Sequence, residues 1–178
     1  MNIFGLFYEV IMTKKQLTYT IVLFSLLGIM FIVLFVFSSQ NAEDSSNLSD
    51  GLLLSILKIF ISDFETISEN QQTFLLESFS VIIRKLAHFS LFFIIGVLSF
   101  LSFYMFKINN FLKLVNAFGI SVFYAIFDEV HQYFVPGRGA SIYDVLIDIS
   151  GSLFGIFVVC MVFLLEIYVQ KVKNTEII

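Results

Sequence analysis

Apolar residues form four long runs along the chain, separated by shorter polar segments. An α-helix rises about 1.5 Å per residue, so about 20 apolar residues cross the roughly 30 Å hydrocarbon core of a bilayer. The runs cover residues 17–37, 86–106, 114–135 and 142–165. This pattern predicts an all-α fold: a polytopic membrane helix bundle with four transmembrane helices, formed by residues 1–178 as a single domain.

The segment 38–85, between the first two runs, has a different pattern. It begins with Ser, Asn and Asp residues and then becomes apolar at helical spacing from Leu53 to Phe64. A second stretch of this kind runs from Phe74 to Ile83. Such spacing is typical of amphipathic helices that lie on a membrane interface. We therefore expect one or two amphipathic helices between the first two spans, which either cap the bundle or form a lid or a partner-binding surface.

Composition supports a membrane protein. Hydrophobic residues make up 58% of the 178 positions, and the mean hydropathy of +0.95 exceeds what soluble domains tolerate. The first run carries no charge over 21 residues, which is longer than the core of a signal peptide, so we expect it to remain as a helix. The net charge is -4, and charges of each sign are segregated along the chain rather than spread over one surface, so we expect no nucleic-acid partner.

Lysine residues are distributed asymmetrically around the four runs. They precede the first run, lie between the second and third runs, and follow the fourth run. Because basic residues concentrate on the cytoplasmic side of a membrane, this distribution predicts that both termini are cytoplasmic and that segment 38–85 is extracytoplasmic. The residues concerned are Lys14, Lys15, Lys107, Lys113, Lys171 and Lys173.

Ionisable residues gather where the third run turns back into the fourth. A charge near the bilayer centre costs about 2.5–3.5 kcal/mol, so such residues usually face a shared interior or a watery cavity. Asp128 lies eight residues before the turn at 136–141, and Asp148 lies seven residues after it. Both carboxylates therefore lie about 10–12 Å below the same surface on adjacent helices, where they can meet. The cluster comprises Asp128, Glu129, His131, Arg138, Asp144 and Asp148.

Helical spacing indicates which side chains share a face. In the third span, His131 and Gln132 follow Asp128 at i+3 and i+4, whereas Glu129 is rotated by about 100° and is expected to point elsewhere. In the second span, one face carries a histidine beneath two cations. Those three residues are Arg84, Lys85 and His88.

The fourth span carries an acidic and a small-residue stripe on one face. Asp144, Asp148, Gly151 and Gly155 recur at spacings of four, three and four. Glycines in such a stripe let a neighbouring helix approach closely. We therefore expect a tightly packed bundle beneath the polar cluster.

These residues predict a polar pocket near the outer surface that binds membrane lipids, in particular an anionic lipid or a peptidoglycan precursor. The alternative is that the groups only satisfy one another, with Arg138 bridging to Asp128 or Asp144 and the histidines donating to carboxylates. The candidate ligand-binding residues are Arg84, Lys85, His88, Asp128, Glu129, His131, Gln132, Arg138, Ser141, Asp144 and Asp148.

Catalysis is a further alternative. A histidine could act as a base oriented by a carboxylate, with the basic residues holding an anionic head group. No phosphatase or acyl-transfer spacing is present, so catalytic residues stay unassigned. We expect no cofactor and no metal, because the two histidines lie on different helices without a His-Glu-x-x-His spacing. The single cysteine, Cys160, excludes an internal disulfide and a cysteine-based metal site.

Three motifs resemble the VanZ-like family of bacterial membrane proteins: FSSQNAEDSS at 37–46, RKLAHF at 84–89 and DEVHQYFVPGRGASIYDVLIDISGSLFG at 128–155. The resemblance implies a small multispanning protein of the bacterial cell membrane. A founding member of that family is associated with resistance to the glycopeptide teicoplanin. The matching positions are Lys85, His88, Asp128, Glu129, Gln132, Gly137, Arg138, Ser141, Asp144, Gly151 and Gly155, whereas Asp148 stands where many members have Asn.

The resemblance and the polar cluster together predict a protein that binds or alters a component of the cell envelope. Such binding would change the access of glycopeptides to the cell surface. The alternative is a membrane enzyme that acts on a lipid-linked phosphate or head group. The sequence leaves open which of the two applies, and it does not indicate an oligomeric state.

Overall fold

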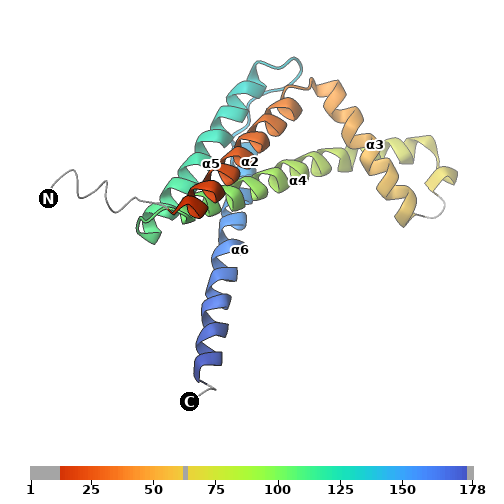
Figure 1. Cartoon of the computed structure of the whole chain (residues 1–178). Helices are drawn as coiled ribbons and strands as arrows, with labels where there is room; N and C mark the ends of the chain where they lie inside the picture. The colour runs from red at the N-terminus through yellow and green to blue at the C-terminus, as the bar shows by residue number, and fades with distance from the viewer. Residues whose placement is uncertain (1–12, 62–63, 176–178) are drawn as a thin grey trace.

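The structure, a computed structural model, describes residues 13–61 and 64–175. Within these ranges it is helical and contains no strand (Figure 1). The elements are α2 (Lys14–Ser38), α3 (Ala42–Phe60), the 3-10 helix η1 (Phe64–Thr66), α4 (Glu69–Tyr104), α5 (Asn110–Tyr133) and α6 (Ile142–Thr175). Four of these, α2, α4, α5 and α6, are long and apolar enough to cross a membrane. The predicted all-α, multi-pass bundle with four spans is therefore confirmed.

Polar caps explain where several helices begin. The side chain of Thr13 accepts a hydrogen bond from the backbone N–H of Gln16 and forms a capping box with it. The Asn41 side chain caps α3, and Asn109 caps α5 in the same way. Such side chains satisfy N–H groups that have no partner inside the helix. The polar segments between the apolar runs thus supply the residues that start the next helix.

The region between the first two spans differs from the prediction in one respect. A helix, α3, does occupy the first apolar stretch, but the second stretch at 74–83 is not a separate helix. It is continuous with the second span, so that α4 has 36 residues and a length of about 54 Å. The reason is local, because residues 69–88 contain neither Gly nor Pro to break a helix. In Figure 1, α3 lies against this extension of α4, away from the remaining helices.

Helix α4 is the centre of the bundle. It contacts α2, α3, α5 and α6, and its contact with α6 is the most extensive. The α4–α6 contact is close because glycines face backbone: a Cβ added at Gly151 would collide with the carbonyl oxygen of Phe89, and one at Gly155 would collide with that of Phe93. The predicted small-residue stripe therefore packs against α4. Gly96 of α4 contributes a third such contact, against the Ser152 backbone.

The main apolar core lies where α2, α4 and α5 meet. Leu34, Phe92, Ile95 and Ala125 are fully buried there. Tyr124 of α5 stacks on Phe31 of α2 with ring centroids 4.0 Å apart, and its hydroxyl donates to the Phe31 carbonyl oxygen. Large apolar side chains elsewhere on the spans are exposed, as is expected for surfaces that contact lipid.

Candidate functional site

The predicted polar residues lie where four elements end or begin beside the middle of α4. Helix α2 ends and α3 begins there, and the loop 134–141 joins α5 to α6. The backbone N–H of Ala42 donates to the carbonyl of Pro136 at 3.3 Å, which ties the two connections together. Gly137 has a positive φ of 77°, and a Cβ at this position would stand 3.0 Å from the Ala42 side chain. Glycine therefore suits this junction in both conformation and space.

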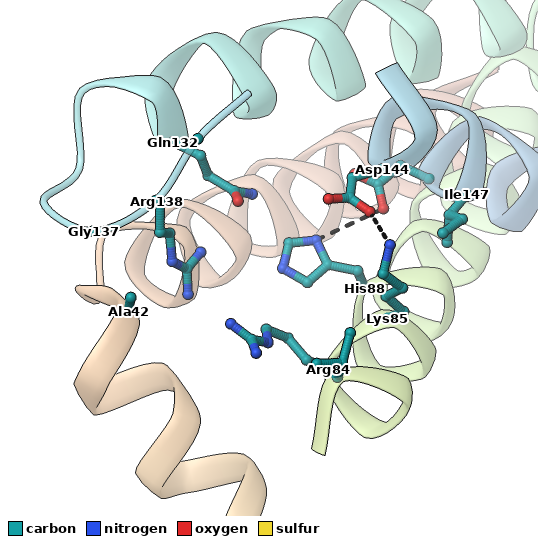
Figure 2. Close-up of a pocket in the computed structure, with 12 residues that line it drawn as sticks. Ala42, Arg84, Lys85, His88, Gln132, Gly137, Arg138, Asp144 and Ile147 are labelled. Atoms are coloured by element: carbon teal, nitrogen blue, oxygen red, sulfur yellow. Dashed lines mark hydrogen bonds and ion pairs between the residues drawn. The ribbon is translucent and has the colours of Figure 1, made fainter. Parts of the chain in front are cut away.

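These elements enclose a polar cavity of about 360 Å³, which we call the polar cavity (Figure 2). Seven of the eleven candidate residues lie on its wall: Arg84, Lys85, His88, Gln132, Arg138, Asp144 and Asp148. Its remaining lining residues are Ala42, Val81, Gly137, Gly139 and Ile147. The cavity thus combines side chains from α3, α4, α5, α6 and the loop 134–141.

An ion pair and a histidine–carboxylate contact join α4 to α6 along this wall. Lys85 Nζ lies 2.5 Å from Asp144 Oδ1, and both side chains are 40% exposed. One turn further along both helices, His88 Nδ1 lies 3.7 Å from Asp148 Oδ1. The second distance is too long for a good hydrogen bond. Figure 2 shows Lys85, His88 and Asp144 on the same side of the cavity.

The deepest part of the site contains two almost fully buried carboxylates. Asp128 is 1% exposed and Asp148 is 2% exposed. The Gln132 amide donates to Asp128 Oδ2 at 2.7 Å, while Asp128 Oδ1 has no hydrogen-bond partner among the described residues. One ligand atom each of His88, Asp128 and Asp148 lies within 4.8 Å of the other two. The predicted meeting of Asp128 and Asp148 is confirmed, and His88 joins them.

Glu129 is rotated away from Asp128, as the spacing predicted, and does not line the polar cavity, yet it is buried in the bundle. Glu129 is only 5% exposed, and its carboxylate accepts a hydrogen bond from the backbone N–H of Ser141. That N–H stands just before the first turn of α6, where helix N–H groups lack internal partners. The inward position of Glu129 therefore fixes the start of α6 against α5. Ser141 contributes a backbone donor here rather than its hydroxyl.

Two arginines face the cavity, and neither forms an ion pair with a carboxylate of the described residues. Arg138 donates to the carbonyl oxygen of Ser38 at 3.4 Å, and its Nε has no partner among the described residues. Burial, and then the nearby positive charge of Arg84, lower the pKa of the Arg138 guanidinium. The bridge from Arg138 to Asp128 or Asp144 is not formed, because Asp144 pairs with Lys85 and Asp128 with Gln132. Figure 2 shows Arg84 and Arg138 on opposite sides of the same space.

His131 lies outside this group. Its ring packs against Phe35 with centroids 4.3 Å apart, and it does not line the polar cavity. His131 was expected to share a helical face with Asp128, but the two side chains contact different neighbours: Phe35 in one case and Gln132 in the other. Its Nδ1 is buried without a partner among the described residues.

A second hollow, which we call the apolar groove, was missed by the sequence interpretation. It has a volume of about 460 Å³ and runs between α3 and α4. Three of its lining residues, Arg84, His88 and Arg138, also line the polar cavity. The apolar spacing of segment 38–85 indicated that α3 has an apolar face. It did not indicate that this face lies against α4 and forms a groove with it. The other lining residues are Phe37, Gln40, Ser45, Leu48, Ser49, Leu52, Ile83, Ala87, Ser90, Leu91 and Ile94.

Comparison with known proteins gives one match. A profile of the family described as VanZ/LLP1 matches residues 4–164. No curated protein and no solved structure matches the chain. The matched range includes all eleven candidate residues and the four glycines of the junction and the α4–α6 contact: Gly96, Gly137, Gly151 and Gly155.

Proposed function

Since this chain belongs to the VanZ/LLP1 family, we propose that it is a multi-pass bacterial membrane protein that binds a phosphate-bearing lipid of the cell envelope. The observation that carries the proposal is the meeting of two hollows of opposite character. The polar cavity and the apolar groove share Arg84, His88 and Arg138. An amphiphile whose charged head enters the cavity can therefore lay its hydrocarbon chain in the groove.

The charges favour an anionic head group. Arg84 and Arg138 face one space, and among the described residues neither has a carboxylate partner. A guanidinium presents several N–H donors in a planar fork that matches phosphate oxygens. A phosphate between the two arginines would also offset their mutual repulsion. We therefore assign Arg138 and Arg84 the role of holding the phosphate.

The apolar groove favours a lipid over a free phosphate ion. Its wall is formed mainly by aliphatic side chains of α3 and α4, including Leu48, Leu52 and Ile94. Burying a CH₂ group against such a surface contributes about 0.8 kcal/mol. A chain of several carbons in the groove would thus add considerably to the affinity that the arginines provide.

The direct test is lipid binding to the detergent-purified protein, measured by native mass spectrometry. The probes are a polyprenyl phosphate, phosphatidylglycerol, the uncharged polyprenol and inorganic phosphate. We expect both phosphate lipids to bind at least about tenfold more tightly than polyprenol or phosphate alone, since one buried charged hydrogen bond contributes about 1.5–3 kcal/mol. Arg138→Gln should lose this preference, whereas Lys107→Gln, in the connection before α5, should keep it. Equal binding of polyprenol and polyprenyl phosphate would rule out the head-group site.

The family resemblance extends the proposal to glycopeptides. We propose that the polar cavity opens to the extracytoplasmic side and that lipid held there changes how teicoplanin reaches its target. Expression in a susceptible host should then raise the inhibitory concentration of teicoplanin. Arg138→Gln at equal abundance should remove the increase, and Lys107→Gln should not. No increase on expression would refute the resistance role and leave lipid binding to be judged by its own assay.

A membrane enzyme that acts on a lipid-linked phosphate is the second candidate. The observation in its favour is the position of His88, 3.7 Å from Asp148 beneath the two arginines. A histidine beside a carboxylate can act as a general acid or base. Incubation of the protein with polyprenyl phosphate, followed by mass spectrometry of the lipids, separates the two. An enzyme converts the lipid, whereas a binding protein returns it unchanged.

A further inference from the structure

We propose that His88, Asp128 and Asp148 bind a divalent metal cation beside the polar cavity, whose wall includes His88 and Asp148. The three residues come from α4, α5 and α6, and one ligand atom from each lies within 4.8 Å of the others. No two of them are close in sequence, so they do not form a recognisable metal-binding motif. For this reason the sequence analysis predicted no metal site.

Burial makes the arrangement hard to explain without a cation. Asp128 and Asp148 are 1% and 2% exposed, so both carboxylates are almost fully removed from bulk water. Asp128 Oδ1 has no partner among the described residues, and His88 lies 3.7 Å from Asp148. A buried carboxylate is costly unless it is paired, hydrogen-bonded or bound to a metal. The groups are thus close enough to share an ion and too far apart to satisfy one another fully.

The geometry fits a first-row divalent ion. Bonds of about 2.0–2.2 Å from histidine nitrogen and carboxylate oxygen are usual for Zn²⁺. To reach such bonds from separations of at most 4.8 Å, each ligand atom must move inward by less than about 1 Å. Side-chain rotation alone supplies such a movement. One nitrogen and two oxygens suit Zn²⁺, Mn²⁺ or Fe²⁺ better than Ca²⁺, which prefers six or more oxygens.

The surroundings resemble a supporting shell around a metal. Gln132 donates to Asp128 Oδ2 and thereby orients that carboxylate, as partners of metal ligands commonly do. Two carboxylates and a neutral histidine give a total charge of about -2, which a divalent cation would cancel. Arg138 faces this group from the cavity side, where its charge interacts with Asp128 and, less strongly, with Glu129. Asp144 is not part of the group because Lys85 pairs with it.

This inference goes beyond the proposed function, because it concerns the metal alone and is tested without lipid. The purified full-length protein is stripped with a chelator, and binding of Zn²⁺ and Mn²⁺ is measured by isothermal titration calorimetry. Elemental analysis after dialysis gives the stoichiometry. We expect one ion per chain. Asp128→Asn and Asp148→Asn should weaken binding by more than about tenfold, since even a changed partner of a metal ligand costs 10–100-fold.

The matched control is Asp144→Asn, the same chemical change on the same cavity wall. It should alter the affinity by less than about threefold, because Asp144 is outside the triad. If a triad variant does not fold, the electronic absorption spectrum of Co²⁺ bound to the wild-type protein replaces it, and nitrogen–oxygen coordination is expected. Binding of neither Zn²⁺ nor Mn²⁺ by the wild-type protein would overturn the inference. So would a loss in Asp144→Asn as large as in Asp128→Asn, which would indicate general charge attraction.

The outcome is distinguishable from that of the lipid proposal. A protein that binds metal but shows no preference for phosphate lipids supports the metal site and refutes the proposed function. A protein that binds phosphate lipids equally well after chelation and in Asp128→Asn, and that takes up no metal, does the reverse. The metal site is therefore tested by metal binding, and the proposed function is tested separately by lipid binding.

Discussion

Substitution of Gly151 by alanine tests whether the α4–α6 contact holds both the fold and the site. A Cβ at Gly151 would collide with the carbonyl oxygen of Phe89 and stand 3.2 Å from its Cα and carbonyl carbon. Unstrained carbon atoms lie about 3.5–4.0 Å apart. Because backbone atoms of α4 cannot rotate away, the two helices must separate by about 0.5–1 Å.

The magnitude follows from two opposing effects. Overpacking of a close contact costs about 1–3 kcal/mol. Alanine is favoured over glycine within a helix by about 1 kcal/mol, which offsets part of that cost. With a collision against backbone, the packing cost should lie in the upper half of its range. We therefore expect Gly151→Ala to lower the free energy of unfolding by about 1–2 kcal/mol, or the melting temperature by about 2–8 °C.

The assay is thermal unfolding in detergent, followed by size-exclusion chromatography of a fluorescent fusion, because the chain contains no tryptophan. Gly28→Ala and Gly119→Ala are the matched controls, since a Cβ at either position would have nothing within 4 Å. Both controls should melt at or above the temperature of the wild type. A Gly151→Ala protein that melts as high as the controls would refute the close packing of α4 on α6.

Substitutions at three further residues test individual contacts by the same unfolding assay. Tyr124→Phe keeps the aromatic stack on α2 but removes the hydroxyl that donates to an α2 carbonyl. It should lower the free energy of unfolding by about 0.5–1.5 kcal/mol. An unchanged free energy of unfolding would show that this hydrogen bond does not stabilise the fold. Lys85→Ala should cost no more than about 1 kcal/mol, because Lys85 and Asp144 are both 40% exposed and solvent screens the pair; a larger loss would contradict that exposure. Glu129→Ala should cost about 1.5–3 kcal/mol by leaving the Ser141 N–H without its acceptor, whereas Glu129→Gln should cost less; equal losses would show that charge matters more than the hydrogen bond.

The four spans could be predicted from sequence because the membrane sets a minimum length for an apolar run. Each predicted run overlaps one of α2, α4, α5 and α6, with small shifts at most ends. The largest difference is at the start of the second span, where α4 begins at Glu69 rather than at Leu86. Hydropathy detects the membrane part of a helix and is insensitive to a polar extension of it. Only the absence of Gly and Pro in residues 69–88 signals that the helix continues.

The composition of the site was less predictable, because it depends on how helices rotate against one another. Spacing along α5 places Asp128 and Gln132 on one face, and the structure keeps them together. The same spacing turns Glu129 away from Asp128 but does not indicate whether it faces the bundle or the lipid; it is buried because its carboxylate accepts a hydrogen bond at the start of α6. The convergence of Asp128 and Asp148 with a histidine of α4 involves three helices. The groove between α3 and α4 also includes residues of α2 and of the loop 134–141. Periodicity within one helix carries no information about such relations.

The contacts between α4 and α6 show which polar residues already have a partner within the fold and which remain available for a ligand. Three contacts follow one another along the two helices. Lys85 contacts Asp144, and His88 contacts Asp148 about one helical turn further on. The next residue of α4, Phe89, packs its backbone against Gly151. Close backbone packing fixes the separation of the two helices, so the level and rotation of each pair are fixed as well. The Lys85 pair is complete and needs no further partner. Charge left unmatched by the fold therefore concentrates in the two arginines of the polar cavity and in the carboxylates beneath them, which is where an anion and a cation would each be stabilised.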